Sequence, residues 1–343
     1  MRRLILAEGL SADPHYAKTM TGILRYARES VVAILDSTRA GETHDGFPVV
    51  GSVNDALCFN PDTATVGVVT QGGYFPPAWL ELLRSCLSKG LSIENGLHVF
   101  LSNDPELVEL ARRHGAELRD LRKPPTDLST ATGANLEVPA QIVLTVGSDC
   151  AIGKMTMGCE LDLEARKRGL RSVMVPTGQT GMIVAGWGIA VDAVVSDFLA
   201  GAAERLVVEG HERGGDLLWV EGQGSIVHPL YSGVALGLMH GSAPHAYVLC
   251  HEAGRDHLEI DGPRRYPMTP LAELVDLHER MSLPARPAKV LAVALNTRFL
   301  DDDAARQAFA DAEAETGLPA DDPVRFGAGK LVDAVLAGLP EAM

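Results

Sequence analysis

The sequence predicts an α/β protein of two domains, and three observations carry this prediction. The chain has 343 residues, whereas single hydrophobic cores stop growing beyond about 250 to 300 residues. Its composition, 46% hydrophobic and 22% charged, is that of a compact globular chain. Short apolar segments alternate with helical patterns along its length, and such alternation is typical of βαβ units with a parallel sheet.

In the first third of the chain, three apolar segments and three helical patterns alternate. Strands are expected at 3–7 (RLILA), 30–37 (SVVAILDS) and 65–70 (TVGVVT), and helices at 16–27, 78–90 and 105–115. Between Asp120 and Val138 the composition shifts to prolines and small polar residues, which suit a linker. We therefore expect a first domain at 1–125, a linker at 126–138 and a second domain at 139–343.

The second domain opens with the strand IVLTV and a helix expected from about Lys154 to Arg168, ended by Gly169. Further strands are expected at 171–176, 216–221, 246–251 and 289–296. These segments are nearly continuous in apolar residues, as strands covered by helices on both faces are. The acidic stretch 301–315 predicts a solvated helix with aspartates in its first turn.

Charge and cysteine content exclude several function classes. The 30 basic and 45 acidic residues give a formal net charge of −15, which argues against nucleic acid or an anionic membrane as partner. The five cysteines form no CxxC pair and no cluster with zinc-like spacing. The apolar stretch at the N-terminus breaks at Glu8, too early for a signal peptide. We expect a cytoplasmic protein, with a homo-oligomer, by default a dimer, as its assembly.

The segment GSDCAIGKMT follows the strand IVLTV and has the character of a phosphate-binding loop. Its two glycines permit unusual backbone angles, the following helix offers its positive end, and the lysine adds a full charge. The usual pattern is G-x-x-x-x-G-K-[ST], but here five residues separate the glycines and methionine follows the lysine. The predicted cofactor-binding residues are Gly147, Ser148, Asp149, Cys150, Ala151, Ile152, Gly153, Lys154, Met155 and Thr156.

The strand DLLWVE ends in Glu221, and an acidic residue at this position next to a phosphate loop can hold magnesium. Thr156 and Glu221 are therefore the candidate metal ligands if the loop binds ATP and Mg²⁺. Thr156 would reach a metal if the helix began one residue later than usual. A strand-to-helix turn with glycines for geometry alone is the structural alternative.

Several separate motifs resemble the DgcN family of D-glutamate N-acetyltransferases: GSDCAIGKMT, the segment from VPTGQTGMIVAGWG to SDFLAGAAE, WVEGQGSIVHP and VALNTR. The segments ILRY, VVAILDS and NGLHVFL precede them. The loop together with DLLWVEGQG is also similar to the dethiobiotin synthetase and cobyric acid synthase branch of P-loop proteins. The resemblance runs from about Ala17 to the C-terminus.

This resemblance implies an N-terminal Rossmann-like domain, similar to CoA-binding domains, and a C-terminal P-loop NTPase-like domain. It also implies acetyl transfer from acetyl-CoA to the amine of D-glutamate or a related acidic amino acid. Coenzyme A carries phosphates that a glycine loop can hold without transferring them, so a serine on magnesium is not needed. The alternatives are an ATP/Mg-dependent kinase or carboxylate-activating ligase, and a non-catalytic nucleotide or CoA-binding protein.

Acetyl transfer to an amine requires a base, and charged residues that end strands are the candidates. They are Glu221, Asp197 and His228, with Asp192 near Asp197. For each, a structural carboxylate or a hydrogen-bonded loop histidine is an equally open interpretation. Cys150 is not assigned as an acyl carrier, because nothing in the sequence pairs it with a histidine.

Two segments are candidates for binding the acidic substrate. The expected loop VPTGQTGMI offers polar side chains and flexible amides at a strand end, where ligands bind in open parallel sheets. A charged segment at 250–267 supplies arginines, which bind carboxylates in bidentate fashion. The predicted substrate-binding residues are Thr177, Gly178, Gln179, Thr180, Gly181, Arg255, Arg264 and Arg265.

In the first domain Asp36 ends an apolar strand, the position that contacts a ribose in dinucleotide-binding folds. No GxGxxG precedes it, which argues against a nicotinamide cofactor. Asn95 and His98 are expected on a strand or at its edge, and a core histidine is as open an interpretation as an active one.

Overall fold

The computed structural model describes residues 1–260 and 263–340. The chain divides into two compact units, 1–124 with 182–186, and 125–181 with 187–343. Each unit has its own sheet and its own hydrophobic core. Within the described ranges, no helix is long and apolar enough to cross a membrane.

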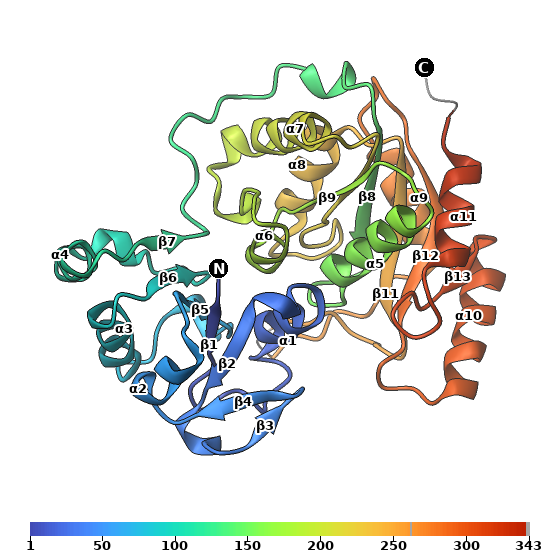
Figure 1. Cartoon of the computed structure of the whole chain (residues 1–343). Helices are drawn as coiled ribbons and strands as arrows, with labels where there is room; N and C mark the ends of the chain where they lie inside the picture. The colour runs from blue at the N-terminus through green and yellow to red at the C-terminus, as the bar shows by residue number, and fades with distance from the viewer. Residues whose placement is uncertain (261–262, 341–343) are drawn as a thin grey trace. The chain divides into compact units, whose positions relative to one another are not determined.

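The first unit contains a seven-stranded sheet of order β3-β4-β2-β1-β5-β6-β7 (Figure 1). All neighbours are parallel except β3 and β4. The strands are β1 (Arg3–Leu6), β2 (Val31–Leu35), β3 (Thr43–His44), β4 (Phe47–Val50), β5 (Thr63–Val66), β6 (Ser92–Asn95) and β7 (Leu118–Asp120). The α-helices are α1 (Lys18–Tyr26), α2 (Val53–Ala56), α3 (Trp79–Ser88) and α4 (Pro105–His114).

Local sequence explains where these elements begin and end. The Asp104 carboxylate accepts hydrogen bonds from the first turn of α4, Pro105 opens this helix, and Gly115 ends it with φ of +67°. The prediction of a strand at 65–70 is wrong beyond Val66, where β5 ends. Gly67 lies so close to β1 that a Cβ would be 2.4 Å from Ile5 Cγ2.

The second unit contains a six-stranded, fully parallel sheet of order β13-β12-β11-β8-β10-β9. The strands are β8 (Gln141–Gly147), β9 (Ser172–Val175), β10 (Leu217–Val220), β11 (Ala246–Glu252), β12 (Lys289–Asn296) and β13 (Ala320–Asp321). Its α-helices are α5 (Lys154–Lys167), α7 (Ser196–Glu212), α8 (Ser232–Ser242), α9 (Leu271–Arg280), α10 (Asp302–Thr316) and α11 (Gly329–Gly338). The helix α6 (Gln179–Ala185) begins in the second unit, and its residues 182–185 belong to the first.

Alternate residues of the central strand β8 face two different sets of helices. Ile142, Leu144 and Val146 belong to the core that α7, α8, α9 and α10 cover (Figure 1). The helices α5 and α11 pack against each other; α5 also contacts β8, β9 and β10, and α11 contacts β12. The prediction of an α/β fold with mostly parallel sheets is confirmed. After β8 the chain continues to the β9 side of the sheet, and after β11 it continues to the β12 side. Ligands bind at such a reversal, at the carboxyl ends of the strands.

Candidate active site

The loop after β8 turns sharply into α5. Ala151 has φ of +53° and Gly153 has φ of +108°, both in the left-handed region that favours glycine. The helix begins at Lys154, directly after Gly153, so its free N–H groups face the loop. Because α5 begins at Lys154, Thr156 lies in the first turn of this helix.

Lys154 lies folded back across this loop. Its side chain is buried, and its Nζ donates a hydrogen bond of 2.6 Å to the Asp149 carbonyl oxygen. A Cβ on Gly147 would lie 3.1 Å from this Nζ, so the lysine occupies space that only glycine leaves open. Burial lowers the pKa of Lys154, and the ionisable groups of Cys150, Cys250, Asp149 and Glu221 oppose this effect. An anion bound here would therefore stabilise the charged lysine.

Asp149 is a fully buried carboxylate inside the loop, and three donors hold it. Its Oδ2 accepts from Arg255 Nη1 at 2.9 Å and from the Glu259 amide at 2.8 Å, and its Oδ1 accepts from the Cys150 amide at 2.7 Å. Arg255 also binds Glu252 through Nε and Nη2, at 2.9 and 2.7 Å. This arginine, predicted to bind substrate, is thus engaged within the protein, where it fixes the shape of the loop.

The structure brings Cys150 close to a histidine, which the sequence did not indicate. Ligand atoms of Asp149, Cys150 and His228 lie within 4.8 Å of one another. His228 Nδ1 accepts a hydrogen bond from the Leu230 amide at 3.2 Å, so Nε2 carries the proton in the neutral ring. This Nε2 lies 3.3 Å from the Glu259 carbonyl oxygen and 3.8 Å from Asp149 Oδ1.

A protonated ring nitrogen is no metal ligand and no base. His228 is also fully buried. Arg255 lies beside the same cluster and pairs with the carboxylates of Asp149, Glu252 and Glu259. The charges of the cluster are therefore engaged with one another within the protein.

Glu221 follows β10 and is buried, with 4% of its surface exposed. Its Oε2 accepts from the amides of Thr177 and Gly178, at 3.0 and 3.2 Å, and its Oε1 accepts from Gln223 Nε2 at 3.2 Å. Burial raises the pKa of Glu221 to about 7, and these hydrogen bonds limit the rise. A Cβ on Gly181 would lie 2.2 Å from Oε2, so glycine is required there.

The segment expected as the loop VPTGQTGMI is a short loop followed by a helix, because α6 begins at Gln179. The predicted substrate residues Thr177 and Gly178 instead bind Glu221 through their amides, and the Thr177 hydroxyl donates to the Glu221 carbonyl oxygen at 2.6 Å. Gln179 and Thr180 lie half-buried in the first turn of α6. This segment thus shapes the surroundings of the Glu221 carboxylate.

The remaining candidates of this unit lie at its surface. Asp197 is exposed in the first turn of α7, a helix that the sequence analysis did not predict, and Asp192 is exposed before it. Arg264 and Arg265 are also exposed, and the neighbouring residues 261–262 of the charged segment lie outside the described ranges.

Comparison with known proteins identifies the family. Family models described as domains of unknown function match residues 129–332, as the DUF1611_C P-loop domain, and 36–124, as the Rossmann-like DUF1611_N domain. A crystal structure of a DUF1611 family protein from Anabaena variabilis is 40% identical, with a TM-score of 0.91 over 98% of this chain and 99% of that one. The chain belongs to the DUF1611 family.

Two curated relatives carry a functional name. A protein of Tritonibacter scottomollicae, named D-glutamate N-acetyltransferase, is 36% identical over 83% of this chain and 84% of its own length. A protein of Pseudoalteromonas sp with the same name is 32% identical over 84% of each chain. The predicted membership of the DgcN-like family, and the Rossmann-like and P-loop domains it implies, are confirmed.

In this DUF1611 protein, further polar contacts around the P-loop had no signal in the sequence. Ser148 Oγ lies 2.9 Å from His251 Nδ1. Asn296, at the end of β12, donates from Nδ2 to the Ile152 carbonyl oxygen and to Glu252 Oε2, both at 3.2 Å. The loop is thus supported by the two strands on one side of β8.

The candidates in the DUF1611_N domain have structural contacts. Burial alone would raise the pKa of Asp36, but hydrogen bonds from Ser11, Thr38 and the Gly9 amide hold it below its usual value. Asn95 is buried and binds the Val99 carbonyl oxygen and Asp120 Oδ1, both at 2.7 Å. His98 packs against Gly73, where a Cβ would lie 2.0 Å from its ring.

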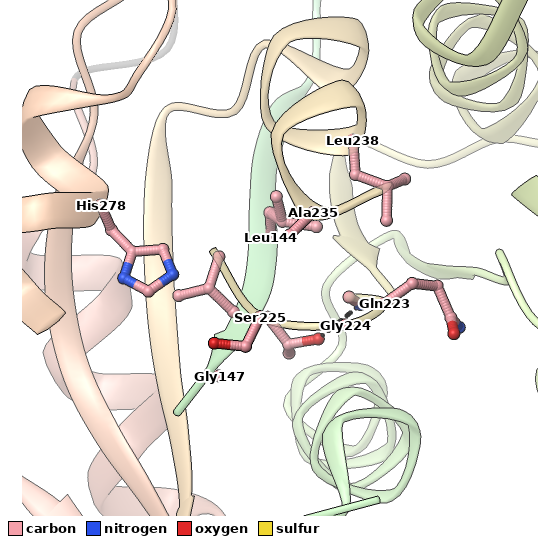
Figure 2. A pocket seen from close by; sticks show the side chains of 11 residues that line it. Leu144, Gly147, Gln223, Gly224, Ser225, Ala235, Leu238 and His278 are labelled. Carbon is pink, nitrogen blue, oxygen red and sulfur yellow. Dashed lines mark hydrogen bonds between the residues drawn. The ribbon is translucent and has the colours of Figure 1, made fainter. Parts of the chain in front are cut away.

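A small cavity lies behind the P-loop, between β8, α8 and α9 (Figure 2). Its volume is about 10 Å³, room for a single water. His278 reaches it from α9; burial lowers the pKa of this histidine to about 4, and its Nδ1 lies 2.7 Å from the Leu274 carbonyl oxygen. This neutral histidine is part of the wall behind the loop, and the cavity is too small for a cofactor.

Proposed function

We propose that this protein is an N-acetyltransferase that transfers the acetyl group of acetyl-CoA to the amine of D-glutamate or a related acidic amino acid. The observation that carries the proposal is the identity of 36% and 32% to two curated relatives of that name, over more than four fifths of each chain. Such a reaction uses a group that binds the cofactor phosphates and a base that accepts a proton. Lys154 in the loop would be the first, and the buried Glu221 would be the second.

The loop would bind the phosphates of acetyl-CoA. A left-handed turn at Gly153, the N-terminus of a 14-residue helix and the Lys154 ammonium group together favour a phosphate. Because these phosphates are held and not transferred, no magnesium-binding serine is required, and Met155 is compatible with this role.

Glu221 would accept the proton that the substrate amine loses. A general base works best when its pKa lies near the working pH, and burial raises the pKa of Glu221 to about 7. Gly222, the residue after Glu221, lies against the Lys154 side chain, because a Cβ there would be 3.1 Å from Lys154 Cδ. The flexible pantetheine arm therefore has to turn back from the loop to bring the thioester beside Glu221.

The test is a turnover assay with purified protein, acetyl-CoA and D-glutamate, with L-glutamate as stereochemical control. We expect release of the CoA thiol together with a product heavier than glutamate by one acetyl group, measured by mass spectrometry. Lys154→Ala should lose this activity at low acetyl-CoA concentration, whereas Lys167→Ala, exposed on the same helix, should keep it. Absence of acetylated product from every acidic amino acid tried would refute the proposal.

A second candidate is an ATP- and Mg²⁺-dependent kinase or carboxylate-activating ligase. The place of Glu221 favours it, since Glu221 follows β10, the strand that pairs with β8 before the loop, and P-loop enzymes use an acidic residue there to hold magnesium. The observation that weakens it is the engagement of Glu221 by the amides of Thr177 and Gly178. Steady release of ADP that depends on an added carboxylic acid would favour this candidate over acetyl transfer.

A further inference from the structure

An exposed aromatic ring lies at the carboxyl end of β12. Phe299 has 74% of its surface exposed, more than any other large apolar side chain in the described part of the chain. The guanidinium carbon of Arg298 lies 4.5 Å from the centroid of this ring, in the geometry of a cation–π pair. Two flat groups are therefore presented together at the edge of the sheet where ligands bind.

Contacts on both sides tie this pair to the phosphate loop. Asn296, two residues before Arg298, donates to the Ile152 carbonyl oxygen within the loop at 3.2 Å. Arg298 Nη2 lies 2.9 Å from Glu252 Oε2. Glu252 is buried and also binds Arg255, the residue that holds the loop carboxylate. Arg298 is thus held beside the residues that support the loop, and Phe299 follows it directly in the chain.

The order of the strands places this pair and Glu221 on opposite sides of the loop. The loop follows β8, Glu221 follows β10 on one side, and Arg298 and Phe299 follow β12, beyond β11, on the other. A nucleotide with its phosphates on the loop can therefore direct its reacting end toward Glu221 and its base toward Phe299.

We propose that Arg298 and Phe299 bind the purine base of the nucleotide whose phosphates lie on the loop. Every base has a π-face that stacks on aromatic rings and guanidinium groups, so the pair offers the chemistry that a purine requires. The inference rests on the proposed function only in that the loop binds nucleotide phosphates, because coenzyme A and ATP both carry adenine. On this inference the residues after β12 bind the base of the nucleotide, and the residues after β10, with Glu221, carry out the reaction.

Isothermal titration with ADP and with inorganic pyrophosphate tests this assignment, because the two probes share the phosphates and differ in the base. In Phe299→Ala we expect the Kd for ADP to rise about tenfold, the loss of one stacking contact, and the Kd for pyrophosphate to stay unchanged. Phe299→Trp should keep the affinity for ADP. Leu163→Ala, which shortens an exposed apolar side chain on α5, is the matched control and should change neither.

Two outcomes would overturn the inference. One is an affinity of the wild-type protein for ADP that does not exceed its affinity for pyrophosphate, and the other is an unchanged Kd for ADP in Phe299→Ala. The turnover assay distinguishes a failure of the base site from a failure of the proposed function. If the wild-type protein acetylates D-glutamate and Phe299→Ala leaves the KM for acetyl-CoA unchanged, the base site is refuted and the proposed function stands.

Discussion

Replacing Glu221 by glutamine tests the buried base through two independent properties, stability and rate. Burial raises the pKa of Glu221 from 4.5 to about 7 in the folded protein. Between these two pH values the folded state keeps a proton that the unfolded state has lost, so stability falls as pH rises through this window. At 1.36 kcal/mol per pKa unit, the ionised carboxylate destabilises the folded protein by about 3 kcal/mol above pH 7.

A glutamine at position 221 fits the same place and carries no charge, so it avoids the destabilisation that the buried, ionised carboxylate causes. One oxygen of Glu221 accepts both amide hydrogen bonds, from Thr177 and Gly178, and the oxygen of a glutamine can do the same. Its amide group would then face Gln223, which presents its own oxygen after a rotation of its side-chain amide. The variant should therefore fold and lose only the charge.

The assay is urea unfolding at pH 5 and pH 8, followed by the fluorescence of the buried Trp219. At pH 8 we expect Glu221→Gln to be more stable than the wild type by about 3 kcal/mol, and at pH 5 this difference should fall to about 1 kcal/mol. Glu209→Gln, on α7, controls for the substitution itself. Acetyl transfer should fall by a factor of about 10² to 10⁴. A stability difference that is equal at both pH values would refute the reasoning.

Three further predictions concern the loop and its support. Lys154→Ala should weaken CoA binding about 10- to 100-fold in isothermal titration, since a charge-assisted hydrogen bond is lost; unchanged affinity would contradict the loop assignment. Gly181→Ala should fold but lose acetyl transfer, because its Cβ would meet the Glu221 carboxylate at 2.2 Å; full activity would show that Glu221 can move freely. Arg255→Ala should lower the free energy of unfolding by about 3 to 5 kcal/mol, because it leaves the buried Asp149 carboxylate without its guanidinium; a loss below 1 kcal/mol in urea unfolding would contradict this.

The sequence predicted elements better than it predicted contacts. IVLTV and KVLAVALN are buried strands, as their apolar runs indicate, and α5 begins at Lys154 as expected. The proximity of Cys150 and His228 had no local signal, because these residues follow different strands and meet only when β8 and β10 pair.

Tertiary pairing also explains the residues whose surroundings differ from expectation. Arg255 was expected to bind a substrate carboxylate, and in the fold its Nη1 donates to the buried Asp149 carboxylate, which follows a different strand. The amides that hold Glu221 come from the turn after β9, which only the parallel pairing of β9 and β10 places beside it. Periodicity and motif spacing describe one segment at a time, so they carry no information on such pairs.

The most direct test of the whole account is a crystal structure of the protein with coenzyme A. We predict that a phosphate of the cofactor lies over the loop from Gly147 to Gly153, within hydrogen-bond distance of Lys154 Nζ and of the first amides of α5. Coenzyme A bound elsewhere, with Lys154 still donating to the Asp149 carbonyl oxygen, would contradict it.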